Sequence, residues 1–314
     1  MKIFVAGATG ALGRQLLPRL AERGHEVTGM TRSPGKQDLL RELGARPVLA
    51  DALDPESVAQ AVAGAEPEVI VHQLTAIPAA LDMRHFARDM AQTNRLRTEG
   101  TDHLLAAARA VGARRFVAQS FAPAIFDRAG APVKSEADPV DEHPPSQMRT
   151  TVAAIRHLER AVTDAPGVEG VVLRYGGFYG PGTSISLGPE GVMVEAIRER
   201  KLPLVGDAGG VWSFIHIGDA ADATVDAVEG EGRGIYNIVD DEPATVSQWL
   251  PAAAAAVGAP APRTVPRWLA RLLAGEAATM LMTEAVGASN AKARRELGWR
   301  PAHATWRDGF ATAL

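Results

Sequence analysis

The chain has 314 residues, which suits one large α/β domain or a nucleotide-binding domain with a smaller appendage. Its net charge of −4 argues against nucleic acid as a partner, and the absence of cysteine excludes disulfides and thiolate catalysis. The N-terminus lacks the regions of a signal peptide, and no apolar run of about 18 residues follows it. We therefore expect a cytoplasmic protein, without a membrane contact, that acts on a small molecule as a monomer or homodimer.

The first expected strand leads directly into a run of glycines. Residues 3–6 are apolar, as in a strand buried on both faces, and Gly7, Gly10 and Gly13 follow. The first glycine permits a tight turn, the second lets the backbone approach a phosphate, and the third allows close packing of helix and strand. Because the N–H groups of a helix start attract anions, the motif predicts a dinucleotide pyrophosphate here. The predicted contacts are Gly7, Ala8, Thr9, Gly10, Ala11, Leu12 and Gly13.

Further apolar runs alternate with helical stretches along the first half of the chain. The runs lie at residues 26–30, 47–50, 69–71, 116–118 and 171–173, and the helices expected between them include residues 82–111 and 146–163. This alternation predicts an α/β fold with a doubly wound parallel sheet. Ligands then bind at the carboxyl ends of the strands.

After about residue 176 the alternation is replaced by Gly-Pro turns, short strands near Leu204 and Phe214, and C-terminal helices. We predict a dinucleotide-binding domain over residues 1–175 and a smaller substrate-binding lobe over residues 176–314, interleaved in one compact unit. Two proline-rich loops, at residues 121–145 and 175–189, are expected to be either lids or solvated connectors.

The end of the second strand indicates which dinucleotide binds. An NAD enzyme usually has an acidic residue there for the ribose 2′-hydroxyl, but this chain has Arg32 and Ser33. A guanidinium pairs well with a 2′-phosphate, so we predict NADP(H); the alternative is a solvated surface arginine. After the third strand, Asp51 and Ala52 are predicted to contact the adenine, although Asp54 is equally suited to cap the next helix.

Motifs along nearly the whole chain carry a family resemblance. They are Thr-Gly-x-x-Gly at residues 9–13, Asp-Ala-Leu-Asp at 51–54, Val-His-Gln-Leu-Thr at 71–75, Phe-Val-Ala-Gln-Ser at 116–120, the segment 173–182, Phe-Ile-His-Ile-Gly-Asp at 214–219 and Tyr-Asn-Ile at 236–238. The chain thereby resembles the atypical branch of the extended short-chain dehydrogenase/reductase family, related to the NAD-dependent epimerases and dehydratases. The resemblance implies a Rossmann fold, a catalytic role for Ser120, and cofactor contacts from Gln73, Leu74, Thr75, Gln119, Gly176, Gly177 and Phe178.

The chain departs from this family at its acid/base pair. Members carry Tyr-x-x-x-Lys on the fifth helix, but alignment on Glu159 puts Thr151 at the tyrosine position and Ile155 at the lysine position. The chain has three tyrosines, at positions 175, 179 and 236, and none has lysine four residues later. The motif is therefore absent, and Arg97 also stands where the family has an asparagine, with Asn94 one helical turn earlier.

Three functions follow from these observations. The first is an NADPH-dependent reductase of a carbonyl or an activated double bond, with an aromatic polyketide-like ketone as one candidate substrate, in which the cofactor supplies the hydride and the Ser120 hydroxyl donates a hydrogen bond to the substrate oxygen. Tyr175 is an alternative proton donor in this reading, because the matching family segment lies against the nicotinamide. The second is a non-catalytic NADP(H)-binding regulator, and the third is a sugar-nucleotide epimerase or dehydratase.

Histidine and serine patterns offer little for other chemistries. The eight histidines show no paired ligand spacing, so we expect no metal, and no Gly-x-Ser-x-Gly motif of a hydrolase is present. His72 ends a buried strand and is expected to be a packed residue. His143 and Arg149 flank the start of the fifth helix. Both alternatives, exposure to solvent and contact with substrate, are left open for them.

Overall fold

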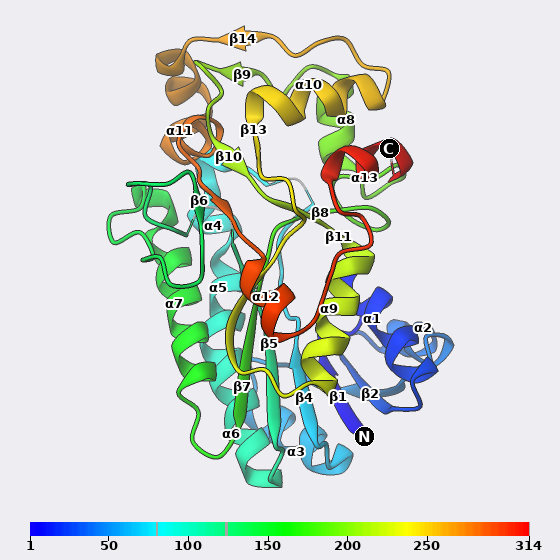
Figure 1. The fold of residues 1–314 in the computed structure, drawn as a ribbon. Helices are drawn as coiled ribbons and strands as arrows, with labels where there is room; N and C mark the ends of the chain where they lie inside the picture. The colour runs from blue at the N-terminus through cyan, green and yellow to red at the C-terminus, as the bar shows by residue number, and fades with distance from the viewer. Residues whose placement is uncertain (80, 123–124, 314) are drawn as a thin grey trace.

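The computed structural model describes residues 1–79, 81–122 and 125–313, and within them seven parallel strands form the central sheet (Figure 1). Their order is β12-β7-β5-β4-β1-β2-β3, which confirms the predicted doubly wound sheet. The bounds are β1 Lys2–Ala6, β2 Glu26–Thr31, β3 Arg46–Leu49, β4 Val69–His72, β5 Arg115–Phe121, β7 Glu169–Tyr175 and β12 Gly234–Ile238. Strand β12 comes from the range expected to form the smaller lobe, and it pairs with β7 in parallel register.

Helices cover both faces of the sheet because its strands are apolar on both sides. On β1, Ile3 and Val5 pack toward α1 (Ala11–Glu22) and α9 (Ile217–Glu229). Phe4 and Ala6 point the other way, toward the face covered by α3 (Pro55–Ala65), α6 (Thr101–Val111) and α7 (Arg149–Thr163). This alternation decides on which face each side chain at a strand end lies.

The helix expected over residues 82–111 is interrupted. The segment begins with a 3₁₀ turn, Met83–His85, and continues as α4 (Phe86–Asp89), α5 (Ala91–Arg95), a π-helical turn at Leu96–Gly100, and α6. The Thr98 and Thr101 hydroxyls donate to the carbonyls of Asn94 and Arg97, at 3.1 and 2.8 Å. A π-turn adds one residue to the helical repeat, and this one contains the buried Arg97.

The smaller lobe lies beyond the carboxyl ends of the strands, in the upper half of Figure 1. Its short strands pair as β8 with β11, β9 with β14 and β10 with β13, and its β15 pairs with β6, a strand from within the first 175 residues. The bounds are β6 Val133–Lys134, β8 Gly177–Tyr179, β9 Leu204–Val205, β10 Val211–Trp212, β11 Phe214–His216, β13 Ala244–Thr245, β14 Thr264–Val265 and β15 Gly287–Ala288. Strands β9 and β11 confirm the short strands expected near Leu204 and Phe214.

The remaining helices are α2 (Gln37–Glu42), α8 (Val192–Arg198), α10 (Val246–Ala256), α11 (Arg267–Thr283), α12 (Ala291–Glu296) and α13 (Trp306–Ala313). The lobe has its own aromatic core, in which Phe214, Trp249, Trp306 and Phe310 are buried. The predicted proline-rich loop 121–145 contains β6, and its positions 123 and 124 lie outside the described residues.

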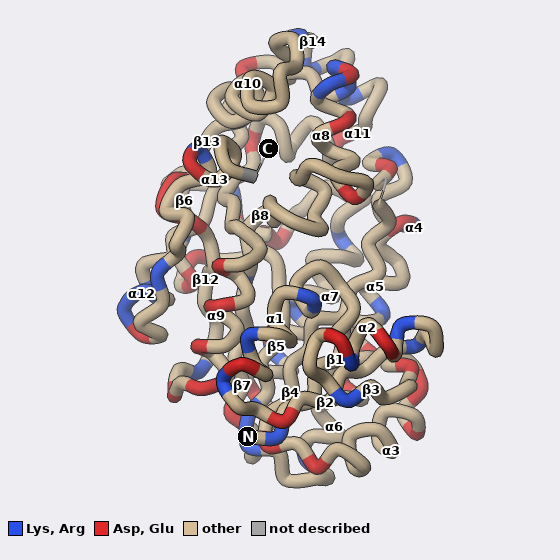
Figure 2. Tube along the Cα trace, turned by 90° about the vertical axis from the view of Figure 1, so that its right-hand side faces the viewer, with Lys and Arg blue, Asp and Glu red and all other residues tan. Residues whose placement is uncertain are grey.

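Charges are distributed over the surface without one dominant sign in the view of Figure 2, where blue and red segments alternate. Across the described residues, no helix combines the length and apolar character that a membrane crossing requires.

Candidate functional site

The glycine turn between β1 and α1 has the geometry that a pyrophosphate cradle needs. Gly7 has φ of +90°, and a Cβ there would lie 2.5 Å from the carbonyl oxygen of Gln73. A Cβ on Gly13 would lie 2.5 Å from the carbonyl oxygen of Ala8, so this glycine permits close packing of helix and strand. At exposed Gly10, an added Cβ would meet just the Gly7 carbonyl oxygen, at 3.3 Å.

The start of α1 is free to receive an anion. Gly10 caps the helix without a side-chain hydrogen bond, and the first turn holds no acidic residue. The first N–H groups of a helix need an external acceptor, and phosphate oxygens satisfy that need. The residues present therefore fit the pyrophosphate of a dinucleotide.

Arg32 and Ser33 directly follow β2, the strand next to β1, and both are exposed. The Arg32 guanidinium makes no ion pair or hydrogen bond with any described residue. On the next strand end, the Asp51 carboxylate accepts a hydrogen bond from the Leu53 N–H at 3.0 Å, while Asp54 caps α3 through the Ser57 N–H at 3.2 Å. Asp54 is thus the helix cap, the contact of Asp51 with adenine stays a prediction, and Ala52 between them is buried.

Gln73 to Thr75 follow β4 and adjoin the glycine turn. The Gln73 N–H donates to the Ala6 carbonyl at 2.8 Å, while its buried side-chain amide has no partner among the described residues. A buried amide without a partner is costly, so a ligand group at this strand end would satisfy it. Leu74 is half-buried and Thr75 is exposed.

His72 is a packed residue, as expected. It is fully buried; its Nε2 lies 3.0 Å from the Thr101 hydroxyl, and its Nδ1 accepts from the Leu74 N–H at 3.2 Å. The Thr101 proton is directed to the Arg97 carbonyl, so His72 must donate from Nε2 and is neutral. Burial lowers the pKa of His72 from 6.5 to about 4.

Ser120, the predicted substrate contact, lies in a buried ionic network on the α7 face. Its hydroxyl donates to Glu159 Oε1 at 2.8 Å. Arg174 on β7 donates to both oxygens of the same carboxylate, each at 2.7 Å. Because a hydroxyl has one proton, Ser120 cannot also donate to a substrate oxygen in this arrangement. The geometry therefore favours a structural role for Ser120, in which it holds Glu159, and argues against the predicted oxyanion contact.

Tyr175 lies on the opposite face of the sheet, among the residues that pack against α1 and α9. Its hydroxyl is 2.7 Å from the hydroxyl of Thr224, which itself donates to the Ala220 carbonyl. Tyr175 is therefore the donor, and burial raises the pKa of its phenol. This fully buried hydroxyl does not have the access that the predicted role as proton donor to substrate requires.

Thr151 and Ile155, the positions predicted for the family's acid/base pair, differ in polarity. Thr151 is buried, and its oxygen accepts from the Asn94 side-chain amide at 3.1 Å. Ile155, one turn later on α7, packs in an apolar cluster with Ala122 and Val239.

The segment that follows β7 contains Gly176, Gly177 and Phe178, which are predicted to contact the cofactor near its nicotinamide. The N–H groups of Gly176 and Gly177 donate to the carbonyls of Ile238 and Ser213, at 3.0 and 2.9 Å. The Phe178 ring packs against the Tyr175 ring, with centroids 5.3 Å apart. Gln119, on β5, is half-buried.

Sequence reasoning placed Arg97 at the family's asparagine position but did not foresee that it would be buried. The side chain is 5% exposed, and one terminal nitrogen has no partner among the described residues. Burial lowers the pKa of Arg97 to about 10, while the nearby Glu159 carboxylate raises it. The one indication in the sequence was that Arg97 occupies a position where the family has an asparagine. The π-turn that contains Arg97 has no clear signature in the sequence.

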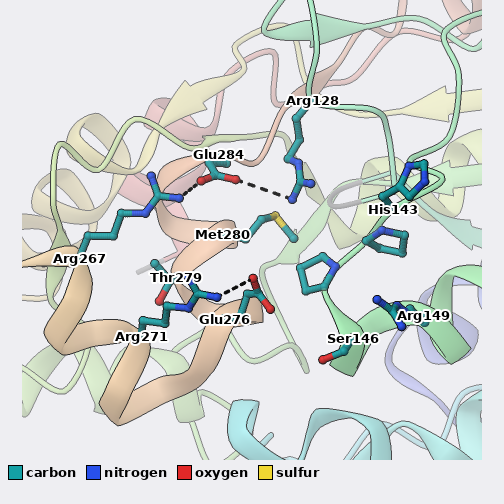
Figure 3. Close-up of a pocket in the computed structure, with 12 residues that line it drawn as sticks. Arg128, His143, Ser146, Arg149, Arg267, Arg271, Glu276, Thr279, Met280 and Glu284 are labelled. Carbon is teal, nitrogen blue, oxygen red and sulfur yellow. Dashed lines mark hydrogen bonds and ion pairs between the residues drawn. The ribbon is translucent and has the colours of Figure 1, made fainter.

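A cavity of about 280 Å³ lies between α11 and the start of α7 (Figure 3). One wall comes from the proline-rich loop and the first residue of α7, the other from α11 and the segment after it. Its lining is mostly charged or polar: Arg128, His143, Pro144, Pro145, Ser146, Arg149, Arg267, Arg271, Glu276, Thr279, Met280 and Glu284. Both residues left open above, His143 and Arg149, face it.

One cluster of described residues has metal-ligand character, which the sequence spacing did not suggest. It consists of His216, Asp219 and His303. The Asp219 oxygens accept from the Ala302 and His303 N–H groups, at 3.1 and 2.9 Å, and His216 Nδ1 accepts from the Gly218 N–H at 3.2 Å. These bonds cap α9 and fasten the C-terminal segment to it.

Comparison with known proteins gives a consistent result. The model of the NAD dependent epimerase/dehydratase family matches residues 3–238. A 3-diazoavenalumate denitrifying reductase from a Streptomyces species is 47% identical over 99% of both chains. A 2-alkyl-3-oxoalkanoate reductase from Stenotrophomonas maltophilia is 32% identical, over 83% of this chain and 77% of that one. The UDP-glucose 4-epimerase of Thermotoga maritima has the same fold, with a TM-score of 0.78 at 22% identity over 100% and 97% of the two chains.

Proposed function

The chain belongs to the NAD-dependent epimerase/dehydratase family and is a reductase, and from this premise we propose that it uses NADPH to reduce an aryldiazonium group, with release of N₂. A nicotinamide dinucleotide is the cofactor that the glycine cradle fits. The choice of NADPH over NADH rests on Arg32, which is exposed at the end of β2 where no carboxylate competes for it. The 47% identical relative, named for a diazo substrate, supports the reacting group.

The observation that carries this proposal is the replacement of the family's acid/base pair by Thr151 and Ile155. Reduction of a ketone to an alcohol consumes a hydride and a proton, and the family's tyrosine supplies that proton. When bound, NADPH supplies a hydride, and an aryldiazonium ion that gains one hydride becomes an arene and N₂ with no further proton. A site without a proton donor is therefore sufficient for this reaction.

Ile155 supports the same substrate on electrostatic grounds. A lysine at this position would hold a positive charge near the reacting group, and like charges repel strongly where water is excluded. The isoleucine instead packs in an apolar cluster with Ala122. The Asn94 side-chain amide donates to the Thr151 hydroxyl oxygen at 3.1 Å. Thr151 is therefore a neutral polar group beside Ile155 on α7.

Reduction of a carbonyl is the second candidate, favoured by the 32% identical relative named for a 3-oxoalkanoate. With no tyrosine at the site, the proton would come from water or from a hydroxyl of the substrate beside its carbonyl. Both named relatives act on compounds that carry a carboxylate, so a small organic acid is the substrate class common to the two candidates.

The test is turnover of paired substrates with NADPH. We expect 3-diazoavenalumate labelled with nitrogen-15 to release labelled N₂ in a one-to-one ratio with the NADP⁺ formed, measured by mass spectrometry and chromatography against a heat-denatured control. Thr151→Val should keep this activity, because the reaction draws no proton from the protein. Turnover of 2-alkyl-3-oxoalkanoates without release of N₂ from the diazo compound would favour the second candidate instead.

A further inference from the structure

The cavity between α7 and α11 has walls that are held in place. The Gln147 side chain, directly before α7, accepts a hydrogen bond from the Ala277 N–H of α11 at 3.2 Å. Beside it, Met148 and Val152 pack with Ala277 and Met280 in one buried apolar cluster. The two walls therefore have a fixed separation, which a binding site for a small ligand requires.

Positive charge exceeds negative charge around this cavity. Three of its four arginines have carboxylate partners: Arg271 pairs with Glu276 at 3.1 Å, and Arg267 pairs with Glu284. Arg128 lies between two carboxylates, 3.4 Å from Asp141 and 3.7 Å from Glu284.

Arg149 is the exception. Figure 3 draws no interaction for its guanidinium, and none is found with the described residues. Four guanidinium groups thus share three carboxylates, and one positive charge faces the cavity without compensation.

We propose that this cavity binds the carboxylate of a small organic acid, and that Arg149 is its principal partner. A guanidinium donates two parallel hydrogen bonds to a carboxylate, and a single added negative charge would neutralise the cavity. Arg149 also stands at the beginning of α7, whose N-terminal N–H groups favour an anion.

The cavity is set apart from the predicted acid/base positions. Arg149 is exposed and precedes the buried Thr151 by two residues, and side chains two residues apart on a helix do not face each other. This inference takes the class of ligand, an organic acid, from the proposed function, but the binding of an acid at Arg149 stands apart from which group is reduced.

A binding experiment tests the inference without turnover. Calorimetry with the NADP⁺-loaded protein would compare trans-cinnamate with trans-cinnamamide, which has the same shape and no charge. We expect the acid to bind on the order of tenfold more tightly, the value of one charge-assisted hydrogen bond. Arg149→Met should remove this preference, and Arg149→Lys should restore part of it.

Arg160→Met is the matched control, because Arg160 is an exposed arginine on the same helix and has no carboxylate partner among the described residues. It should keep the preference for the acid. Equal affinity of the unmodified protein for acid and amide, or an unchanged preference in Arg149→Met, would overturn the inference. If cinnamate binds through Arg149 but diazo compounds are not reduced, the proposed function fails and the carboxylate site stands.

Discussion

Ser120 illustrates how one hydrogen bond separates a structural from a catalytic role. Its hydroxyl is buried, and its single proton is directed at Glu159, the carboxylate that also holds Arg174. We expect Ser120→Ala to lower the free energy of unfolding by about 1.5–3 kcal/mol, the range for a hydrogen bond to a charged group. Turnover by the variant should be nearly unchanged. Denaturant unfolding and steady-state kinetics measure the two effects.

Ser120→Thr provides the control, because it keeps the hydroxyl. A Ser120→Ala protein of normal stability with a rate lowered a hundredfold would restore the sequence-based prediction of an oxyanion contact, for which about 2–4 kcal/mol of barrier is typical.

Arg32 differs from Ser120, since its guanidinium has no partner among the residues that the structure describes. If its guanidinium pairs with a 2′-phosphate, NADPH should bind about tenfold or more tightly than NADH, the scale of one charge-assisted contact. Arg32→Ala should lower the affinity for NADPH and leave that for NADH, with no expected change in stability because the side chain is exposed. Fluorescence titration with both cofactors measures this. Lys36→Ala, a nearby exposed cation, is the comparison; equal affinities in the unmodified protein would contradict the prediction.

At the level of elements, the parallel strands could be predicted because each is a short apolar run buried on both faces. The faces themselves were available from the alternation of side chains: Val171, Leu173 and Tyr175 share one face of β7, and Arg174 lies on the other. Because Tyr175 and Arg174 are neighbours on the strand, they lie on opposite faces of the sheet, and Tyr175 lies on the face away from α7. This alternation would have argued against Tyr175 as a proton donor near Thr151. Which helix covers which face was the missing information.

The contacts between elements could not be predicted from the sequence. The Ser120–Glu159–Arg174 network joins β5, α7 and β7, whose residues are up to 54 positions apart, and no local pattern indicates the pairing. The π-turn before α6 is equally hidden, because threonine back-bonding is compatible with an ordinary helix. The arginine cavity needs three segments to meet, so Arg149 alone gave no reason to prefer a ligand over solvent.

For the whole molecule, the cradle, the network and the cavity all lie where the sheet's carboxyl edge meets the smaller lobe. The central sheet fixes the relative positions of α1 and α7, while α11 of the smaller lobe closes the cavity. The stability of this junction therefore depends on buried polar groups that are neutral or paired. His72, at the end of β4, is a buried neutral imidazole whose pKa is lowered to about 4, and the buried Asp240 carboxyl has a pKa that burial raises to about 8.

The difference in pH-dependent stability between the unmodified protein and a variant without the His72 imidazole should report His72, because the raised pKa of Asp240 contributes with the opposite sign over the same range. Its pKa is about 4 in the folded protein and 6.5 when unfolded, so between these values the unfolded chain binds a proton that the folded protein does not. Stability from this residue is complete above pH 7 and decreases as the pH falls toward 4. The full loss is about 3 kcal/mol, of which roughly 2 kcal/mol is gone by pH 5.

Chemical unfolding at a series of pH values measures this loss in the unmodified protein and in two variants. His72→Asn keeps an acceptor for the Leu74 N–H but has no imidazole to protonate, so it should be less stable at pH 7 and decline less steeply below it. His157→Asn, at a surface histidine of α7, should keep the acid-side decline of the unmodified protein apart from the small contribution of its exposed ion pair with Asp102. An acid-side decline that is as steep in His72→Asn as in the unmodified protein would mean that other buried groups, and not His72, set the limit at low pH.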